Sequence, residues 1–421
     1  MRVTLVNHRY LPFRGGSELY IQKLAERLAS KGVYSRVVTT DAFDLEYFWD
    51  PAAKAVDALS RECKNGVEVE RLSIRHPPLS RLLFPVSRRG MGEASRFVPA
   101  TLPFELVSRV LPRMPGLLST LLSAGRQDIV VASNLGLEGL AIVASQAAAK
   151  MGSAFVLLPF AHIGDGSGAI AHRYVSMPHH RELVQQADLS IALTELEAKF
   201  LEELGANRSR IVVAGAGVDL PADGCFPSTP KAEDRSPPFS VLSIGAMARD
   251  KGTMDLVEAS RLLWNRGVRH TLTLVGPEMR SFSDWFRSTG AANCRWIECR
   301  GVVDEAEKRA LLSSADVLAL PSRTESFGIV YLEAWSYRKP VIGAAVGAVS
   351  EVIDDGVDGL LAPFGYPAAI ADAIERLASN PEFAECMGRA GFAKVERSFT
   401  WDRVLERIEE GFRTVLGIDA G

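Results

Sequence analysis

Short apolar runs alternate with helical patterns along most of this chain, and that alternation restricts the folds open to it. The runs that we predict to be buried strands are residues 3–6, 36–40, 129–132, 154–158, 240–244, 271–275 and 317–320. Helical patterns follow near residues 17–30, 253–266, 304–314 and 367–379. Strands that alternate with helices build parallel sheets covered by helices on both faces, so the sequence predicts an α/β fold.

The length of the chain and one polar segment predict two domains. At 421 residues the chain exceeds the size of one ordinary hydrophobic core. Residues 220–238, rich in proline, serine and charge, lie between the two series of strands and have the composition of a linker. We therefore predict two doubly wound, Rossmann-like domains at 1–222 and 239–396. Ligands bind at the carboxyl ends of the strands in such folds, so we expect the site in a cleft between the domains.

Charge and cysteine usage exclude several classes of protein. The 48 basic and 51 acidic residues give a formal net charge of -3, which argues against a dedicated nucleic-acid binder. Five scattered cysteines form no zinc-like pairs, which favours reduced thiols in a cytoplasm. The apolar stretch 129–149 is interrupted by Asn134, Gly136 and Gly139, which favours a buried strand and helix over a membrane span. Because the chain opens on a predicted strand and shows no signal peptide, we expect a cytoplasmic protein, at most peripheral to a membrane.

The segment 71–113 departs from the alternation. It contains eight arginines and no lysine, opposed only by Glu93 and Glu105, and apolar residues are interleaved with the arginines. One interpretation is an irregular excursion whose arginines are solvated or paired with the other domain. The other is a surface that touches an anionic membrane or a lipid-linked acceptor.

Two glutamates eight residues apart form the most informative motif. Glu325 precedes the start of a predicted helix and Glu333 lies about two turns into it. The residues between them that we expect to offer backbone N–H groups to an anion are Ser326, Phe327, Gly328, Ile329 and Val330. A nucleotide sugar suits this arrangement, because its diphosphate lies between two hydroxylated parts. A general acid and base, as in glycoside hydrolysis, is the alternative. Eight residues of continuous helix separate the two carboxylates by about 12 Å, which favours two hydroxyl-binding anchors.

Three further clusters follow predicted strands. Gly16 ends a Gly-Gly turn that lets the backbone approach a ligand before a helix, and we predict that it binds the donor, although such turns are structural more often than functional. His162 follows the strand 154–158, where a histidine is either a hydrogen-bonded structural residue or part of the site. Arg249 and Lys251 follow the strand 240–244 and would neutralise a diphosphate, although surface-loop cations are often only solvated.

Several of these motifs closely resemble the retaining family 4 glycosyltransferases of the GT-B fold. The segments that carry the resemblance are 245–252, 275–277, 301–303, 315–333, 339–343, 347–351 and 355–361. In the first half it is weaker and rests on Gly15-Gly16, His162, Ala187-Asp188 and 217–219. The E-x7-E spacing with its flanks is specific, whereas the Gly-Gly turn is not.

The resemblance implies roles for these residues. Glu325 would contact sugar hydroxyls near the anomeric centre, with His162 beside the transferred sugar, and Glu333 would bind the ribose. The N–H groups of 328–330 and Lys251 would receive the phosphates. The first domain would hold the acceptor, the second the nucleotide sugar, and 397–421 would cross back onto the first. Retention of configuration without metal or other cofactor is also implied, because basic side chains and a helix end stabilise the leaving diphosphate.

Two departures and two rival functions remain. Ala246 stands where the family usually has arginine, and we hypothesise that Arg249 reaches the same phosphate. Ala216 stands where asparagine is common. A nucleotide-sugar isomerase or hydrolase on the same fold is the main alternative, and a binding protein with a degenerate site is another. The acceptor is left open between a lipid-linked molecule, a polysaccharide and a small molecule.

Overall fold

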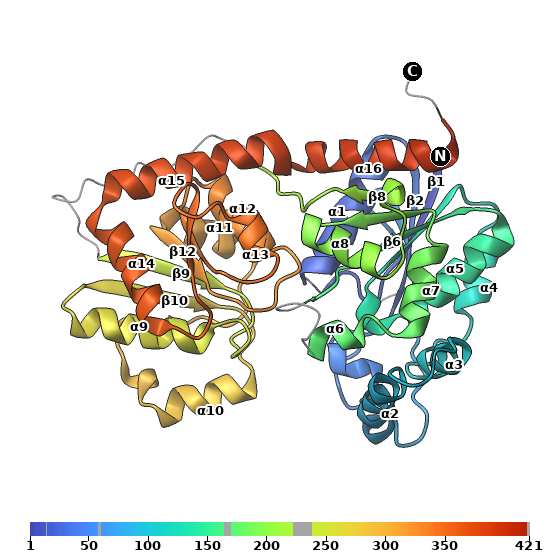
Figure 1. Ribbon diagram of the computed structural model, residues 1–421, viewed down its shortest axis with the longest axis horizontal. Helices are drawn as coiled ribbons and strands as arrows, with labels where there is room; N and C mark the ends of the chain where they lie inside the picture. Colours follow the sequence, from blue (N-terminus) through green and yellow to red (C-terminus); the bar gives the residue numbers. More distant parts are fainter. Residues whose placement is uncertain (14, 58–59, 164–169, 222–237, 419–421) are drawn as a thin grey trace. The chain divides into compact units, whose positions relative to one another are not determined.

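The computed structural model describes residues 1–13, 15–57, 60–163, 170–221 and 238–418. The chain divides into two compact units (Figure 1). The first unit comprises Met1–Gly215 and Val404–Gly421, and the second comprises Ala216–Arg403. The predicted linker falls largely outside the described residues. Each unit contains a parallel sheet with helices on both faces, as the alternation of strands and helices predicts.

The first unit is built around an eight-stranded sheet of described residues, in the order β3-β4-β2-β1-β5-β6-β7-β8. Its strands are β1 (Arg2–Val6), β2 (Tyr34–Thr40), β3 (Arg61–Lys64), β4 (Val67–Leu72), β5 (Ile129–Ser133), β6 (Ala154–Leu158), β7 (Leu189–Ala192) and β8 (Ile211–Val213). Its α-helices are α1 (Gly16–Ser30), α2 (Ser80–Ala94), α3 (Leu102–Val110), α4 (Leu117–Ser123), α5 (Gly139–Met151), α6 (Ile170–Tyr174), α7 (Pro178–Gln186) and α8 (Glu195–Glu203). Short 3-10 turns are η1 (Leu45–Phe48), η2 (Leu135–Leu137) and η3 (Arg208–Arg210). All strand pairs are parallel except β3 with β4.

The second unit contains a six-stranded, all-parallel sheet of described residues, in the order β11-β10-β9-β12-β13-β14. Its strands are β9 (Phe239–Ile244), β10 (His270–Val275), β11 (Ile297–Cys299), β12 (Val317–Leu320), β13 (Val341–Ala344) and β14 (Gly359–Ala362). Its helices are α9 (Thr253–Asn265), α10 (Arg280–Ser288), η5 (Ala291–Asn293), α11 (Glu305–Ser314), α12 (Ile329–Ser336), α13 (Val349–Val352), α14 (Pro367–Ser379), α15 (Pro381–Lys394) and the π-helix η6 (Val395–Phe399). Strands β12 and β13 are buried along their whole length, because parallel strands covered on both faces need apolar side chains on each.

The last helix, α16 (Trp401–Leu416), begins in the second unit and continues into the first. Val404, Leu405, Ile408 and Phe412 are fully buried at helical spacing, so the apolar stripe along this helix is core packing. The Arg407 guanidinium donates to the carbonyl of Ala214 from both Nε (3.0 Å) and Nη2 (2.7 Å). These contacts fix α16 beside the end of β8 in the first unit.

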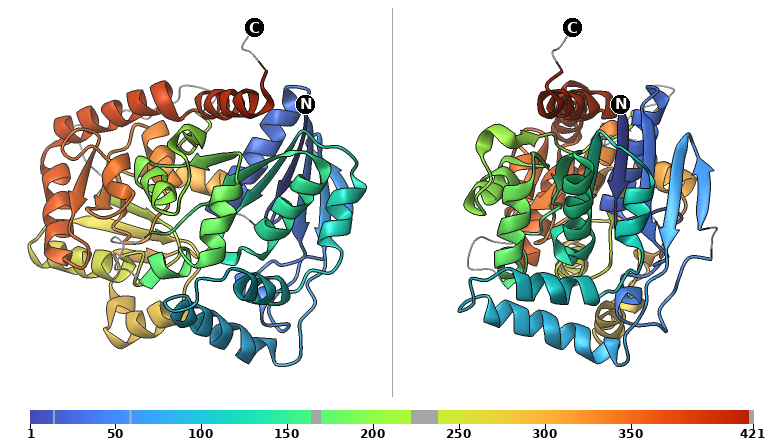
Figure 2. Two further views of the ribbon diagram at one scale, coloured as in Figure 1. Left: turned by 45° about the vertical axis from the view of Figure 1, so that its right-hand side comes forward. Right: turned by 90° about the vertical axis from the view of Figure 1, so that its right-hand side faces the viewer.

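The segment 71–113 is largely helical, so the expected irregularity was wrong. Most of it forms α2 and α3, which lie beyond the carboxyl ends of the first unit's strands (Figures 1 and 2). Among the described residues, no helix is both long and apolar enough to span a membrane.

Candidate functional site

Two strand-to-helix turns meet in the second unit because β9 and β12 are parallel neighbours. Their carboxyl ends therefore lie side by side, and the turn before α9 contacts the turn before α12. The carbonyl of Asp250 accepts the N–H of Arg323 (2.9 Å), and its carboxylate accepts the hydroxyl of Thr324 (3.1 Å). These bonds hold the two loops in register.

Lys251 and Glu325 form an ion pair at this junction. The Lys251 Nζ donates to Glu325 Oε1 (2.7 Å) and to the carbonyl of Thr324 (2.9 Å). The Lys251 and Glu325 side chains are 22% and 16% exposed, so both are accessible from one side. The structure thus brings together two site residues that lie far apart in the sequence.

The pair depends on a close approach at Gly252. This residue has φ +69°, and a Cβ there would lie 2.1 Å from the carbonyl oxygen of Pro321. Only glycine permits that contact in this backbone conformation. The approach draws the loop after β9 onto the loop after β12, and Lys251 onto Glu325.

The amino end of α12 is the next feature of the site. Gly328 takes a left-handed conformation (φ +88°), and the helix begins at Ile329 without a side-chain cap among the described residues. The first turn of an uncapped helix carries N–H groups and a partial positive charge. Ile329 and Val330 are half-buried, so this end can receive an anion. Glu333 lies little more than one turn into α12, which corrects the expectation of two turns.

Two of the predicted donor-binding residues lie just before Gly328. Ser326 is half-buried, whereas the Phe327 side chain is buried and meets the Phe399 ring edge-on, with 5.5 Å between centroids. Only the backbone of Phe327 is therefore suited to the role that the resemblance implies. The Phe327 ring packs in the core of the second unit.

Glu333 pairs with a cation that the sequence did not single out. Lys308, on α11, donates from its Nζ to Glu333 Oε1 (2.7 Å). Burial raises the pKa of the Glu333 carboxyl, although the Lys308 charge opposes that shift. Burial in turn lowers the pKa of Lys308, but the Glu333 and Glu305 carboxylates together outweigh it and leave the pKa raised. The pair fixes the orientation of Glu333 on its helix.

Arg249 is exposed in the loop after β9. Burial raises the pKa of Asp255, in the first turn of α9, while the nearby Arg249 guanidinium lowers it. Arg249 is therefore close to the start of α9, in the same loop as Lys251.

The first unit contains the two remaining site residues. His162 is exposed beyond the carboxyl end of β6, and Gly16 is exposed at the first position of α1. His162 follows a strand, as the sequence predicts. Gly16, which we predict to bind the donor, lies in the unit that we predict to hold the acceptor.

A buried carboxylate holds the backbone next to His162. Glu197 Oε1 accepts the N–H of Ala161 (2.6 Å), and its Oε2 accepts the N–H of Leu193 (2.7 Å). Phe160 has φ +44°, a strained conformation for a residue with a side chain. Sequence reasoning missed Glu197, although Thr194 caps the amino end of α8 three residues earlier, a recognisable capping-box spacing.

Glu197 predicts a pH dependence of stability. Burial raises the pKa of its carboxyl to about 7, against the two N–H bonds, which lower it. In the unfolded chain this carboxyl releases its proton near pH 4.5. The contribution of Glu197 to the free energy of unfolding is therefore full below that pH and falls as the pH rises toward 7. Replacing Glu197 with glutamine removes the titration. We expect the wild-type free energy of unfolding, relative to the variant, to fall by about 2 kcal/mol between about pH 5 and about pH 8.

Urea unfolding of both proteins across that range measures the difference. Glu203→Gln, at an exposed position on the same helix, is the matched control: it keeps Glu197, so the difference between the wild type and this variant should not change with pH. A wild-type curve parallel to that of Glu197→Gln would contradict the prediction.

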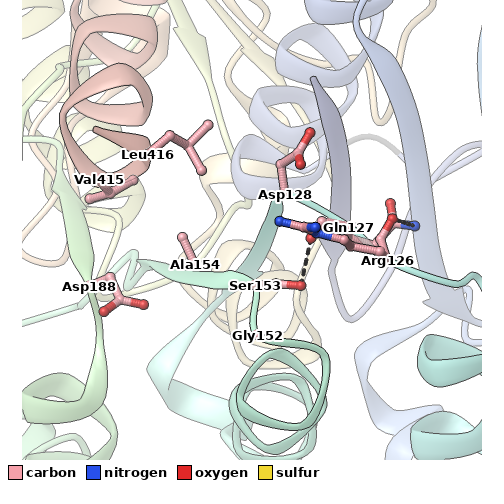
Figure 3. A pocket seen from close by; sticks show the side chains of 9 residues that line it. All are labelled: Arg126, Gln127, Asp128, Gly152, Ser153, Ala154, Asp188, Val415 and Leu416. Atoms are coloured by element: carbon pink, nitrogen blue, oxygen red, sulfur yellow. Dashed lines mark hydrogen bonds between the residues drawn. The ribbon is translucent and has the colours of Figure 1, made fainter. Parts of the chain in front are cut away.

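A hollow of about 310 Å³ opens at the end of the first unit's sheet that is opposite to His162 (Figure 3). Its lining includes Asp128 and Asp188, which precede β5 and β7, and Leu416 of α16. It therefore lies at the amino ends of the strands, away from His162. Ligands of doubly wound folds bind at the carboxyl ends, so we do not assign the site to this hollow.

Two protein-family models match the chain. "Glycosyl transferase 4-like domain" matches residues 15–217, and "Glycosyl transferases group 1" matches residues 238–380. Together they cover well over half of the chain.

Curated relatives show the same similarity over part of their length. D-inositol 3-phosphate glycosyltransferase of Paenarthrobacter aurescens is 32% identical over 257 residues, 57% of this chain and 62% of that protein. Alpha-maltose-1-phosphate synthase of Mycobacterium tuberculosis is 30% identical over 223 residues, 50% of this chain and 53% of that protein. The matches thus span about six-tenths or less of these relatives.

Solved structures share the fold over nearly the whole chain. Anabaena HepE, in complex with UDP and glucose, has a TM-score of 0.69 at 16% identity and covers 97% of this chain and 98% of its own. Sucrose-phosphate synthase from Thermosynechococcus elongatus has a TM-score of 0.69 at 19% identity, with 99% of each chain covered. The fold is therefore GT-B.

Proposed function

The chain belongs to the group 1 and 4-like glycosyl transferases, and from this premise we propose that it moves a sugar from a nucleoside diphosphate to an acceptor hydroxyl. The observation that carries the proposal is the Lys251–Glu325 pair beside the uncapped amino end of α12, with Glu333 on the same helix. The Lys251 cation and the start of α12 match the diphosphate of a nucleotide sugar, and the two carboxylates match its two hydroxylated parts.

The donor is assigned to the second unit. The diphosphate takes the N–H groups at the start of α12 and the Lys251 charge, Glu333 takes the ribose hydroxyls, and Glu325 takes sugar hydroxyls. A glycosyltransferase among the relatives, and fold neighbours solved in complex with UDP or UDP-glucose, support a nucleoside diphosphate sugar as donor.

The reaction that we propose retains configuration. The anomeric carbon loses its bond to the diphosphate oxygen and gains a bond to the acceptor oxygen on the same face, and the acceptor proton passes to the leaving diphosphate. Negative charge develops on the diphosphate in the transition state. Lys251 and the α12 amino end stabilise that charge because they are already in place, so the reaction is proposed to need no metal.

We assign the acceptor to the first unit, with His162 beside the transferred sugar. Inositol phosphate and sugar phosphate occur in the names of relatives, which supports a hydroxylated acceptor. A lipid-linked molecule, a polysaccharide and a small molecule all fit that description, and the setting that we propose is cytoplasmic or membrane-peripheral.

Ligand-induced stabilisation tests the proposal. UDP, ADP, GDP and UDP-glucose are added separately, and at least one nucleotide is expected to raise the unfolding temperature of the wild-type protein. Lys251→Met should lose this shift, whereas Arg261→Met, on the outer side of α9, should keep it. Absence of a shift with every nucleotide sugar tried would overturn the assignment. Product formation that needs no acceptor would instead indicate an isomerase or hydrolase.

Arg249 has its own test, because it replaces the missing arginine at position 246 in our interpretation. Removing one phosphate-facing charge typically weakens binding by about 1.5–3 kcal/mol, so Arg249→Ala is expected to raise the Kd of the bound nucleoside diphosphate roughly tenfold or more. Isothermal titration measures that change. Arg261→Ala is the control for a lost arginine in the same unit, and equal affinities of the two variants would show that Arg249 has no such role.

A further inference from the structure

Helix α2 turns an apolar face toward solvent. Leu79, Leu82, Leu83 and Val86 are all exposed, and their spacing of three and four residues places them on one side of the helix. The opposite side of α2 is buried through Phe84 and Met91. One side of α2 therefore packs against the protein through apolar residues, and a second apolar stripe on the other side faces solvent.

Helix α3 continues this surface. Leu102, Leu106 and Val110 lie four residues apart on its outer side and are exposed, while Phe104 and Ser108 face inward and are buried. Phe97, between the two helices, is 82% exposed. Among the described residues, nine of the seventeen exposed large hydrophobic side chains fall between Leu79 and Val110. Such a concentration marks an interaction surface, since soluble surfaces usually scatter these residues singly.

Exposed arginines accompany the apolar stripe. Arg75, Arg89 and Arg113 are exposed in or at the ends of this segment. Arg81 and Arg96 are exposed too, but they pair with Asp50 (3.3 Å) and Glu93 (3.0 Å). Glu93 and Glu105 are the acidic residues of 71–113. The surface therefore combines apolar side chains with a net positive charge.

A buried polar cluster fixes the inner side of both helices. Glu138 Oε1, just before α5, accepts hydrogen bonds from Arg88 of α2 (2.6 Å) and from Ser108 of α3 (2.5 Å). The Nε2 of His179, on α7, lies 2.8 Å from the same oxygen, and the His180 ring packs beside it. Arg88 already supplies the counter-charge of Glu138, so we assign this cluster to holding the helices and not to binding a cation. The outward face of α2 and α3 is thus held in one orientation.

We propose that the outer face of α2 and α3 docks on an anionic lipid bilayer. Apolar side chains enter the interface between headgroups and acyl chains, and the arginines pair with lipid phosphates. A second copy of the chain suits this face poorly, because a two-fold contact would set arginines against arginines.

The location of the face also bears on the acceptor. It lies at the carboxyl ends of the first unit's strands, the end that carries His162. Docking would bring a lipid-linked acceptor to that end, and this last step rests on the proposed function. Bilayer binding itself does not.

Vesicle sedimentation of the full chain tests the docking without any nucleotide. The wild-type protein is expected to sediment with phosphatidylcholine vesicles that contain phosphatidylglycerol and to remain in solution with phosphatidylcholine alone. The double variant Leu82→Ser/Val86→Ser should bind at least about tenfold more weakly, and Arg89→Gln/Arg113→Gln about fivefold more weakly per arginine. Val302→Ser/Val357→Ser, at exposed positions of the second unit, should bind as the wild type does.

Circular dichroism and the unfolding temperature of each variant confirm that it is folded. Equal binding by the wild type and Leu82→Ser/Val86→Ser would overturn the proposal, as would no binding to either vesicle. A concentration-dependent dimer that the same variant disperses would overturn it in favour of a second copy. Nucleotide-induced stabilisation is measured separately, so failure of lipid binding and failure of the proposed activity are distinguishable.

Discussion

Replacing Glu325 with alanine is expected to lower the rate of sugar transfer roughly 10²–10³-fold, the usual cost of removing one preorganised group from a transition state. Glu325 is the carboxylate that Lys251 holds at 2.7 Å, on the loop next to the α12 amino end. A group fixed in this way can bind sugar hydroxyls without first being ordered. Turnover with a saturating nucleotide sugar and the acceptor measures the effect.

The affinity for nucleoside diphosphate separates this role from a general loss of structure. Glu325 places a negative charge beside the site that we assign to the diphosphate, so Glu325→Ala should bind UDP or another nucleoside diphosphate at least as tightly as the wild type. Glu298→Ala, an exposed glutamate on the edge strand β11, is the control and should leave both quantities unchanged. Full transfer activity in Glu325→Ala would contradict the proposed role of Glu325 in transfer.

The second large effect is expected at Gly328. An alanine there combines a left-handed backbone (φ +88°) with a Cβ that would lie 2.4 Å from Cε2 of Tyr331. Tyr331 is buried and donates its hydroxyl to the carbonyl of Leu320 (2.6 Å), so its ring has little room to move. We expect Gly328→Ala to destabilise the second unit by about 2–4 kcal/mol, from backbone strain and overpacking together. The affinity for nucleoside diphosphate should fall as well, because the start of α12 shifts.

Gly356→Ala separates strain from overpacking. Gly356 has φ +76°, but a Cβ there would meet no atom within 4 Å. This variant should therefore cost only about 1–2 kcal/mol and leave nucleotide affinity unchanged. Urea unfolding and titration of both variants give the comparison, and equal losses at the two positions would refute the steric part of the argument.

Much of the fold follows from local patterns in the sequence, and the exceptions have a physical reason. The apolar runs that became β1, β5, β6, β9, β10 and β12 are recognisable because both faces of a parallel strand must be apolar. Strand β3 could not be recognised in this way, because Arg61 to Lys64 form an antiparallel edge strand whose side chains are mostly exposed. In α2 and α3 the outer apolar stripes obscure the usual helical period, which made 71–113 look irregular.

The part of the site that could be predicted is also the part that local sequence patterns encode. Glu325, Glu333 and the helix between them are neighbours in sequence, so their spacing could be interpreted directly. The Lys251–Glu325 bond instead depends on β9 lying beside β12, and the Lys308–Glu333 bond on α11 lying beside α12. Partners of this kind come from the order of the elements in space, which periodicity alone does not encode. Glu197 carried a local signal, but its contact with the backbone beside His162 did not.

Helix α16 has a consequence for how the protein is made. The first unit needs residues from Val404 onward to cover its apolar surface, yet all of Ala216–Arg403 is synthesised before them. During synthesis, the apolar surface that Ile408 and Phe412 later cover therefore stays exposed until α16 has been made. Chaperones commonly bind such exposed surfaces. The second unit, by contrast, is one continuous stretch of chain. Isolating the first would require joining α16 to it by circular permutation or supplying the helix as a separate peptide.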